Sequence, residues 1–94
     1  MNRAEILNGA IKCVCQDRQD QYGSPENNFA KIADFWNTYM GERLMVQFDG
    51  EDVAMMMALL KIARITTGQP KSDNYIDACG YIACAGEVGG LWQD

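Results

Sequence analysis

The chain has 94 residues, 48% of them hydrophobic, and a formal net charge of −5. A chain of this length forms one domain, residues 1–94, and its apolar fraction excludes an intrinsically disordered protein. The negative charge argues against binding to duplex DNA or RNA, because phosphate contacts need a basic face. A membrane span needs about 18 consecutive apolar residues, and the sequence has no such run, so we expect no membrane partner.

The cysteines predict a location and argue against one kind of metal site. There are four of them and no histidine, and no two cysteines form a C-x-x-C pair, so a zinc site is not expected. Free thiols on helices are usually buried packing residues. Because residues 1–20 also lack the pattern of a signal peptide, we expect the reducing cytoplasm. The cysteines are Cys13, Cys15, Cys79 and Cys84.

Two helices are predicted in the first half of the chain. Asn2 and Glu5 have the spacing of a capping box, and the apolar stripe that follows fades near Gln19. Ser24 suits an N-cap and Pro25 suits the first helical position of the second helix. Its broad apolar face includes Phe29, which we expect in the core, and Gly41 is its expected end.

Two more helices follow a segment that we interpret as a loop. Residues 42–50 alternate like a short strand, but no second strand is available to pair with it. The third helix is predicted to open at Asp49 or Gly50 and to cover residues 51–67, with Gly68 closing it. Its middle is apolar almost all round, which is typical of a helix enclosed on every side.

The fourth helix is predicted over residues 73–88, with Ser72 as its N-cap and two glycines at its end. Trp92, in the tail, is expected to pack back on the domain or to meet another subunit. The fold class is therefore an all-α, compact bundle of four helices. Because three neighbours do not suffice to enclose the third helix, we expect a homo-oligomer.

A polar cluster is predicted between the third and fourth helices. Lys61 and Arg64 are three residues apart and share one face, while Asp73, Asp77 and Tyr81 share a face of the next helix. A short connection makes the two helices antiparallel neighbours, so the cations and carboxylates can meet. This arrangement is either an ion-pair network that fixes helix register or a binding site.

The stretch DRQDQYGSPENNF, residues 17–29, predicts a junction between helices and one wall of a site. Arg18 suits the end of a helix, and Gly23 allows an unusual backbone geometry. Tyr22 is suited to stacking on a base, and Asn28 to hydrogen bonding with a base or a ribose. A helix start beside them attracts phosphate through its free N–H groups. The ligand-binding candidates are Arg18, Tyr22, Gly23, Asn28, Lys61, Arg64, Asp73, Asp77 and Tyr81; no catalytic residue is predicted.

Three segments carry a resemblance to a family of small, mostly uncharacterised phage and prophage proteins. They are DRQDQYGSPENNF, EDVAMMMALLKIAR and DNYIDACGY. The resemblance implies a phage origin, and with it a location in the cytoplasm of an infected bacterial cell. More distantly, the helical layout and acidic helix starts resemble the all-α nucleoside triphosphate pyrophosphohydrolases related to MazG, which hold magnesium with four carboxylates.

The sequence departs from the pyrophosphohydrolase pattern in its carboxylates. Glu51 and Asp52 are adjacent and point in different directions on a helix, and Asp52 is also suited to capping that helix. At most three well-directed carboxylates remain, Asp52, Asp73 and Asp77, with two cations nearby to compete for them. Such a set suits binding a phosphate better than cleaving one.

Three functions are consistent with these features. The first is a non-catalytic protein that binds a small phosphorylated nucleotide, with no cofactor; in a phage it would sequester a cyclic or NAD-derived nucleotide of host immune signalling. The second is a magnesium-dependent pyrophosphohydrolase, in which Asp52, Asp73 and Asp77 hold the metal and Glu26 or Glu51 orients water. The third is a helical bundle that binds another protein, with a purely structural polar cluster.

Overall fold

The computed structural model describes residues 1–17 and 23–90. Throughout these residues the chain is helical with connecting loops and no strand, so the predicted all-α bundle of four helices is confirmed. Arg18, Tyr22 and Trp92 lie outside the described residues. The elements are α1 (Arg3–Lys12), the one-turn π-helix η1 (Cys13–Asp17), α3 (Pro25–Met40), the 3₁₀ turn η2 (Gly41–Arg43), α4 (Gly50–Ile65) and α5 (Ser72–Val88).

The first two helix starts use the predicted caps. The Asn2 side chain accepts a hydrogen bond from the Glu5 N–H at 2.8 Å, and the Glu5 carboxylate accepts one from the Asn2 N–H at 3.3 Å. At α3, Ser24 Oγ accepts from the Asn27 N–H at 3.3 Å, and Pro25 occupies the first helical position. Each cap satisfies N–H groups that have no partner within the helix.

Two boundaries differ from the predictions for the last two helices. α4 ends at Ile65, two residues early, because the Thr66 and Thr67 hydroxyls donate to the Ala63 carbonyl at 2.8 and 3.2 Å. Ser72 is not the N-cap of α5 but its first residue. Lys71 takes the cap position without a side-chain hydrogen bond, and its carbonyl accepts from the N–H of Asn74 at 3.2 Å.

The segment between α3 and α4 is mainly a loop, as the sequence indicated. One amide side chain, that of Asn37, holds it. Asn37 donates from Nδ2 to the Phe48 carbonyl at 3.0 Å and accepts from the Phe48 N–H at 2.7 Å. The Phe48 ring meets Trp36 edge-on, with the ring centroids 6.0 Å apart. These contacts hold the end of the loop against α3. Val46, earlier in the loop, is exposed.

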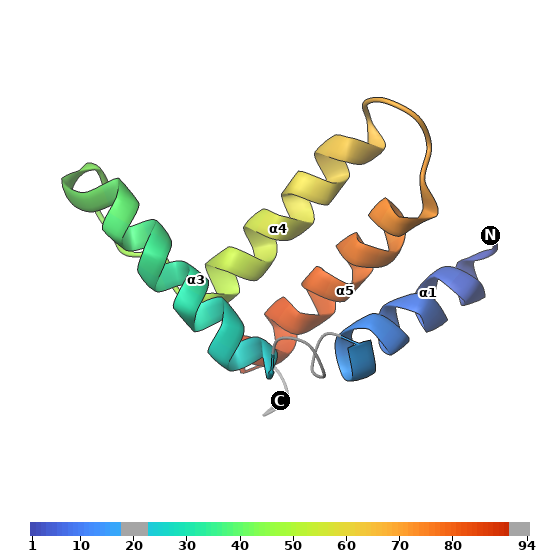
Figure 1. Ribbon diagram of the computed structural model, residues 1–94, viewed down its shortest axis with the longest axis horizontal. Helices are drawn as coiled ribbons and strands as arrows, with labels where there is room; N and C mark the ends of the chain where they lie inside the picture. Colours follow the sequence, from blue (N-terminus) through green and yellow to red (C-terminus); the bar gives the residue numbers. More distant parts are fainter. Residues whose placement is uncertain (18–22, 91–94) are drawn as a thin grey trace.

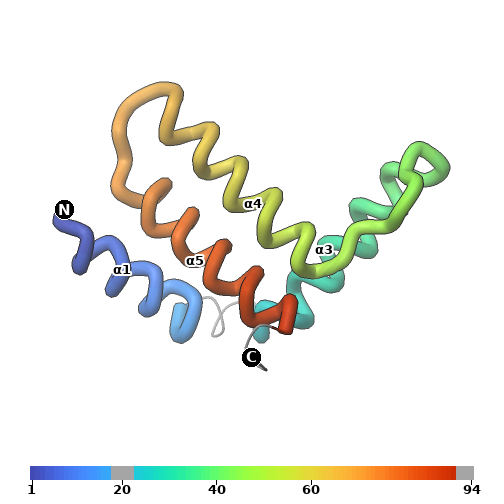
Figure 2. Tube along the Cα trace, turned by 180° about the vertical axis from the view of Figure 1, so that it is seen from behind, coloured from blue at the N-terminus to red at the C-terminus, as the bar shows by residue number. Residues whose placement is uncertain are grey.

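The helices form a layer with one helix crossing its end. α1, α5 and α4 lie side by side, and α3 leaves the layer near the start of α4 and the end of α5 (Figure 1). The view from behind shows α3 diverging from α4 along its length (Figure 2). The main core lies where α3, α4 and α5 meet. It consists of small residues around two rings: Phe29, Ala33, Val53, Ala54, Ala58, Tyr81, Cys84 and Ala85.

Within a single chain, α4 is not enclosed as predicted. Val53, Ala54 and Ala58 are buried, but Leu59 is 59% exposed. Further large apolar side chains of α3 and α4 also face solvent: Phe35, Tyr39, Met55, Met56, Leu60 and Ile62. In the described part of the chain, no helix is long and apolar enough to cross a bilayer.

Candidate functional site

An ion pair joins the two antiparallel helices α4 and α5. Lys61 Nζ lies 2.9 Å from Asp77 Oδ2, and the two side chains are 14% and 26% exposed. The sequence predicted this meeting from the helical spacing of the charges. Because the pair is only partly desolvated, the attraction between its two charges is stronger than that of a surface pair. The Lys61 ammonium group also remains partly exposed to a competing anion.

Arg64 and Asp73 lie toward the open end of the same helix pair. Arg64 follows Lys61 by three residues on α4, and Asp73 precedes Asp77 by four on α5, so each shares a face with its neighbour. Both are exposed. The structure thus brings all four predicted charged residues to one region of α4 and α5.

Three uncharged candidates meet at the start of α3. Gly23, Asn28 and Tyr81 line one small cavity with a volume of about 10 Å³. The Tyr81 ring is 6% exposed and packs against Phe29, with the ring centroids 6.2 Å apart. Tyr81 is therefore part of the core rather than an exposed stacking platform, and the cavity has room for about one water molecule.

The two groups of candidates are connected along α5. Asp77 and Tyr81 are four residues apart and so lie one above the other on the same face. We call the residues of these two groups the α5 strip: Gly23, Asn28, Tyr81, Asp77 and Lys61.

Asp52 performs the capping role that its position suggested. Its carboxylate accepts from the Asp49 N–H at 3.0 Å, and Asp49 accepts from the Asp52 N–H at 2.9 Å, which completes a capping box at α4. Asp52 precedes Lys61 by nine residues, so it lies roughly 13 Å along the helix axis from the ion pair. The three carboxylates Asp52, Asp73 and Asp77 are not brought together. Among the described residues, no group of three or more acidic, cysteine or histidine side chains is placed to hold a metal ion.

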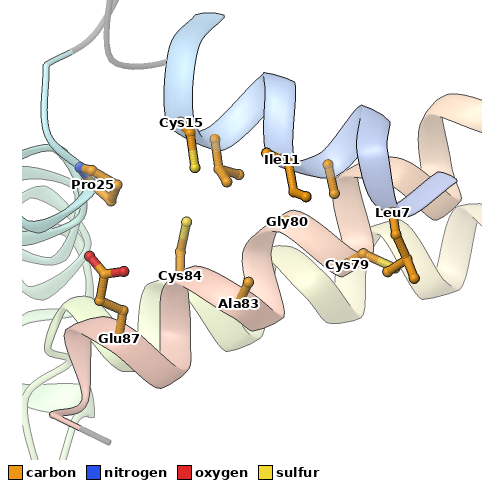
Figure 3. Close-up of a pocket in the computed structure, with 11 residues that line it drawn as sticks. Leu7, Ile11, Cys15, Pro25, Cys79, Gly80, Ala83, Cys84 and Glu87 are labelled. Carbon is orange, nitrogen blue, oxygen red and sulfur yellow. The ribbon is translucent and has the colours of Figure 1, made fainter. Parts of the chain in front are cut away.

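A large cavity lies between α1 and α5, where no site was predicted. Its volume is about 460 Å³, and its lining is mainly apolar. Figure 3 shows the thiols of Cys15 and Cys84 pointing toward one another across it, with the Glu87 carboxylate at the end near Pro25. The signal in the sequence was a pair of four-residue repeats. One is Leu7 and Ile11 on α1 with Cys15 on η1, and the other is Cys79, Ala83 and Glu87 on α5. Such repeats also describe ordinary helix packing.

Comparison with known proteins finds a family and two similar phage proteins that match the chain. Residues 5–89 match the family described as "Domain of unknown function (DUF6378)". The chain is 39% identical to the "Gene 55 protein" of Mycobacterium phage L5 over 76 residues, which are 81% of this chain and 47% of that protein. It is 31% identical to the "Gene 55 protein" of Mycobacterium phage D29 over 83 residues, 88% of this chain and 52% of that protein.

The match covers this chain more completely than it covers its relatives. The chain spans about half the length of the curated relatives it matches. No solved structure matches the chain.

Proposed function

The chain belongs to the DUF6378 family of phage proteins, and we propose that it binds a small phosphorylated nucleotide without cleaving it. The α5 strip is the observation that carries the proposal. It includes a half-buried lysine, a carboxylate and an amide, and Arg64 adds a second cation beside it.

Phosphate binding would use the two cations of α4. Lys61 is held by Asp77 in the absence of ligand, and an incoming phosphate competes with that carboxylate for the ammonium group. Arg64 is exposed and free to present its planar guanidinium to two phosphate oxygens. Asp77 and Asn28 then provide an acceptor and an amide for hydroxyl or base groups.

The biological role that we propose is sequestration. In an infected cell, this binding would remove a signalling nucleotide, either cyclic or derived from NAD, from the host cytoplasm. Tight binding without turnover needs charge-assisted contacts but no metal cage. The described carboxylates support this reading, because Asp52 caps α4 and Asp77 is paired with Lys61.

Surface area supports a homo-oligomer as the binding species. The chain exposes 6862 Å², whereas a compact monomer of its mass exposes about 5,400 Å². A standard interface buries about 800 Å² on each partner. The surface that the chain exposes beyond that of a compact monomer is larger than this area, so it is sufficient for a stable contact between subunits. The exposed apolar side chains of α3 and α4, including Phe35, Tyr39 and Leu59, are the surface that we expect to be buried. A cavity of about 10 Å³ cannot hold a nucleotide, so we expect neighbouring subunits to complete the site.

Native mass spectrometry and isothermal titration with a panel of cyclic, linear and NAD-derived nucleotides test the proposal. We expect one nucleotide to be retained unchanged at a fixed ratio to subunits. Lys61→Gln and Arg64→Gln should each weaken its binding about tenfold or more, because a charge-assisted hydrogen bond is lost. Lys31→Gln removes the same charge from an exposed position of α3 and is the matched control. Absence of binding to every nucleotide in the panel would refute the proposal.

The same experiment separates two alternatives. The distant resemblance to MazG-related pyrophosphohydrolases predicts release of pyrophosphate from a triphosphate in the presence of magnesium. Asp52, Asp73 and Asp77 do not fit one magnesium ion within a chain, because Asp52 lies at the other end of the helix pair. A protein-binding bundle instead predicts no response to nucleotides and partner binding that survives the combined Lys61→Met and Asp77→Leu change.

A further inference from the structure

The cavity between α1 and α5 is created by the way these helices pack. The two helices touch closely through glycines. A Cβ atom at Gly9 would lie 3.0 Å from Ile76 Cδ1, and one at Gly80 would lie 2.8 Å from Val14 Cγ1. Beside this line of contact, most of the α5 residues that line the cavity are small: Cys79, Gly80, Ala83 and Cys84. Ala83 leaves space at the floor. The result is an elongated hollow, not a filled interface.

The walls of this hollow, which we call the trough, have a defined chemical character. Leu7 and Ile11 of α1 and Cys15 of η1 form one wall at four-residue intervals, and Cys79, Ala83 and Glu87 of α5 form the other. Both repeats keep their side chains on one helix face. Among the described residues of the lining, Glu87 is the one that is charged, and its carboxylate lies at the Pro25 end (Figure 3).

We propose that the trough binds an elongated apolar molecule with a cationic end, such as an alkylammonium ion. The volume of about 460 Å³ falls within the range of small-molecule sites, roughly 300–1,000 Å³. The apolar part would lie between Leu7, Ile11 and Ala83, and the cation would pair with Glu87. An anionic end would instead meet a carboxylate of the same sign, and the described lining residues include no cation to offset it.

The trough does not include the charged end of the α5 strip, but its lining shares Val14, Pro25 and Cys84 with the small cavity at the other end of the strip. Binding in the trough does not depend on the nucleotide proposal. Cys79 follows Asp77 by two residues, a rotation of about 200° around α5. Cys79 therefore lies on the side of α5 opposite the ion pair. The two sites require ligands of opposite charge: phosphate beside Lys61 and an ammonium group beside Glu87.

Cysteine alkylation measures occupancy of the trough residue by residue. Cys15 and Cys79 line the trough, while Cys13 lies on the same π-helix as Cys15 but outside the lining. The folded protein is treated with iodoacetamide, and the rate at each cysteine is followed by peptide mass spectrometry. Three probes of equal length are compared: octylammonium, 1-octanol and octanoate. Saturating octylammonium should slow alkylation of Cys15 and Cys79 about fivefold or more and leave Cys13 unchanged.

Two variants distinguish the apolar contact from the charge contact. Glu87→Gln should lower the affinity for octylammonium about threefold to fivefold, the range for an exposed ion pair, and leave 1-octanol unchanged. Ala83→Leu fills the floor and should abolish protection by all three probes. Ile82→Ala, at an exposed position next to Ala83 and outside the lining, is its control and should keep protection.

Three outcomes would overturn the proposal. One is equal protection of Cys13 and Cys15, since it would indicate global stabilisation rather than occupancy. Another is equal affinity for octylammonium and octanoate, which would remove the role of Glu87. The third is protection of Cys15 that rises with protein concentration and needs no probe, because a second copy of the chain would then occupy the trough.

Discussion

Replacing Gly80 with alanine measures how closely α1 approaches α5. Two effects oppose each other at this buried helical position. Alanine favours the helix over glycine by about 1 kcal/mol. Its Cβ, however, would lie 2.8 Å from Val14 Cγ1, and overpacking of this kind costs about 1–3 kcal/mol. The valine cannot move away easily, because a β-branched side chain has few rotamers. We expect a net loss of about 1 kcal/mol in the free energy of unfolding.

Urea unfolding followed by circular dichroism, at one fixed protein concentration, provides the measurement. Gly9→Ala is the matched control, because the atom nearest its Cβ would be Ile76 Cδ1 at 3.0 Å, a terminal methyl that rotation about χ2 moves away, while the branch atom Cγ1 would lie at 3.3 Å. It should be neutral or stabilising by up to about 1 kcal/mol. In a Val14→Ala background the clash is removed, so Gly80→Ala should then stabilise. If Gly80→Ala stabilises the unaltered chain as Gly9→Ala does, α1 does not pack on α5 as described.

Three further predictions concern the loop, the ion pair and the exposed face. Asn37→Ala should lower the free energy of unfolding by about 2 kcal/mol in urea titrations, because it leaves both backbone groups of Phe48 without their partner; an unchanged midpoint would contradict this. Lys61→Met should cost about 1–2 kcal/mol by leaving Asp77 unpaired, and adding Asp77→Leu should restore most of the stability in a double-mutant cycle. Leu59→Glu should shift the native mass spectrum toward monomer, and an unchanged distribution would place the subunit interface elsewhere.

Local chemistry made the helix starts predictable. Asn2, Ser24 and Asp49 cap their helices because a short polar side chain reaches N–H groups within three residues. The same reasoning gave the wrong cap for the last helix, where Ser72 was predicted. Its type suits a cap, but the α5 helix starts one residue earlier, at a position set by the turn from Lys71. Nothing in the residues nearby distinguishes these two starts.

Longer-range features were only partly predictable from the sequence. The meeting of Lys61 with Asp77 followed from two helical repeats and a short connection. The burial of Tyr81 against Phe29 did not, because the spacing gives a helix face but not what covers it. The trough was missed for a similar reason. It depends on the separation of α1 and α5, which is set by Gly9 and Gly80 through tertiary contacts.

The placement of both proposed sites on α5 leads to a final prediction about their coupling. Coupling needs an element with two arrangements that each ligand biases differently. Asp77 and Ala83 are six residues apart, about 120° around one continuous helix, which is packed on one side by α4 and on the other by α1. We therefore expect independent binding: Ala83→Leu should leave nucleotide affinity unchanged in titrations, and Lys61→Gln should leave octylammonium protection of Cys15 unchanged. If either variant alters the other site more than about twofold, α1 moves on α5 when a ligand binds, since a rigid helix pair transmits no such change.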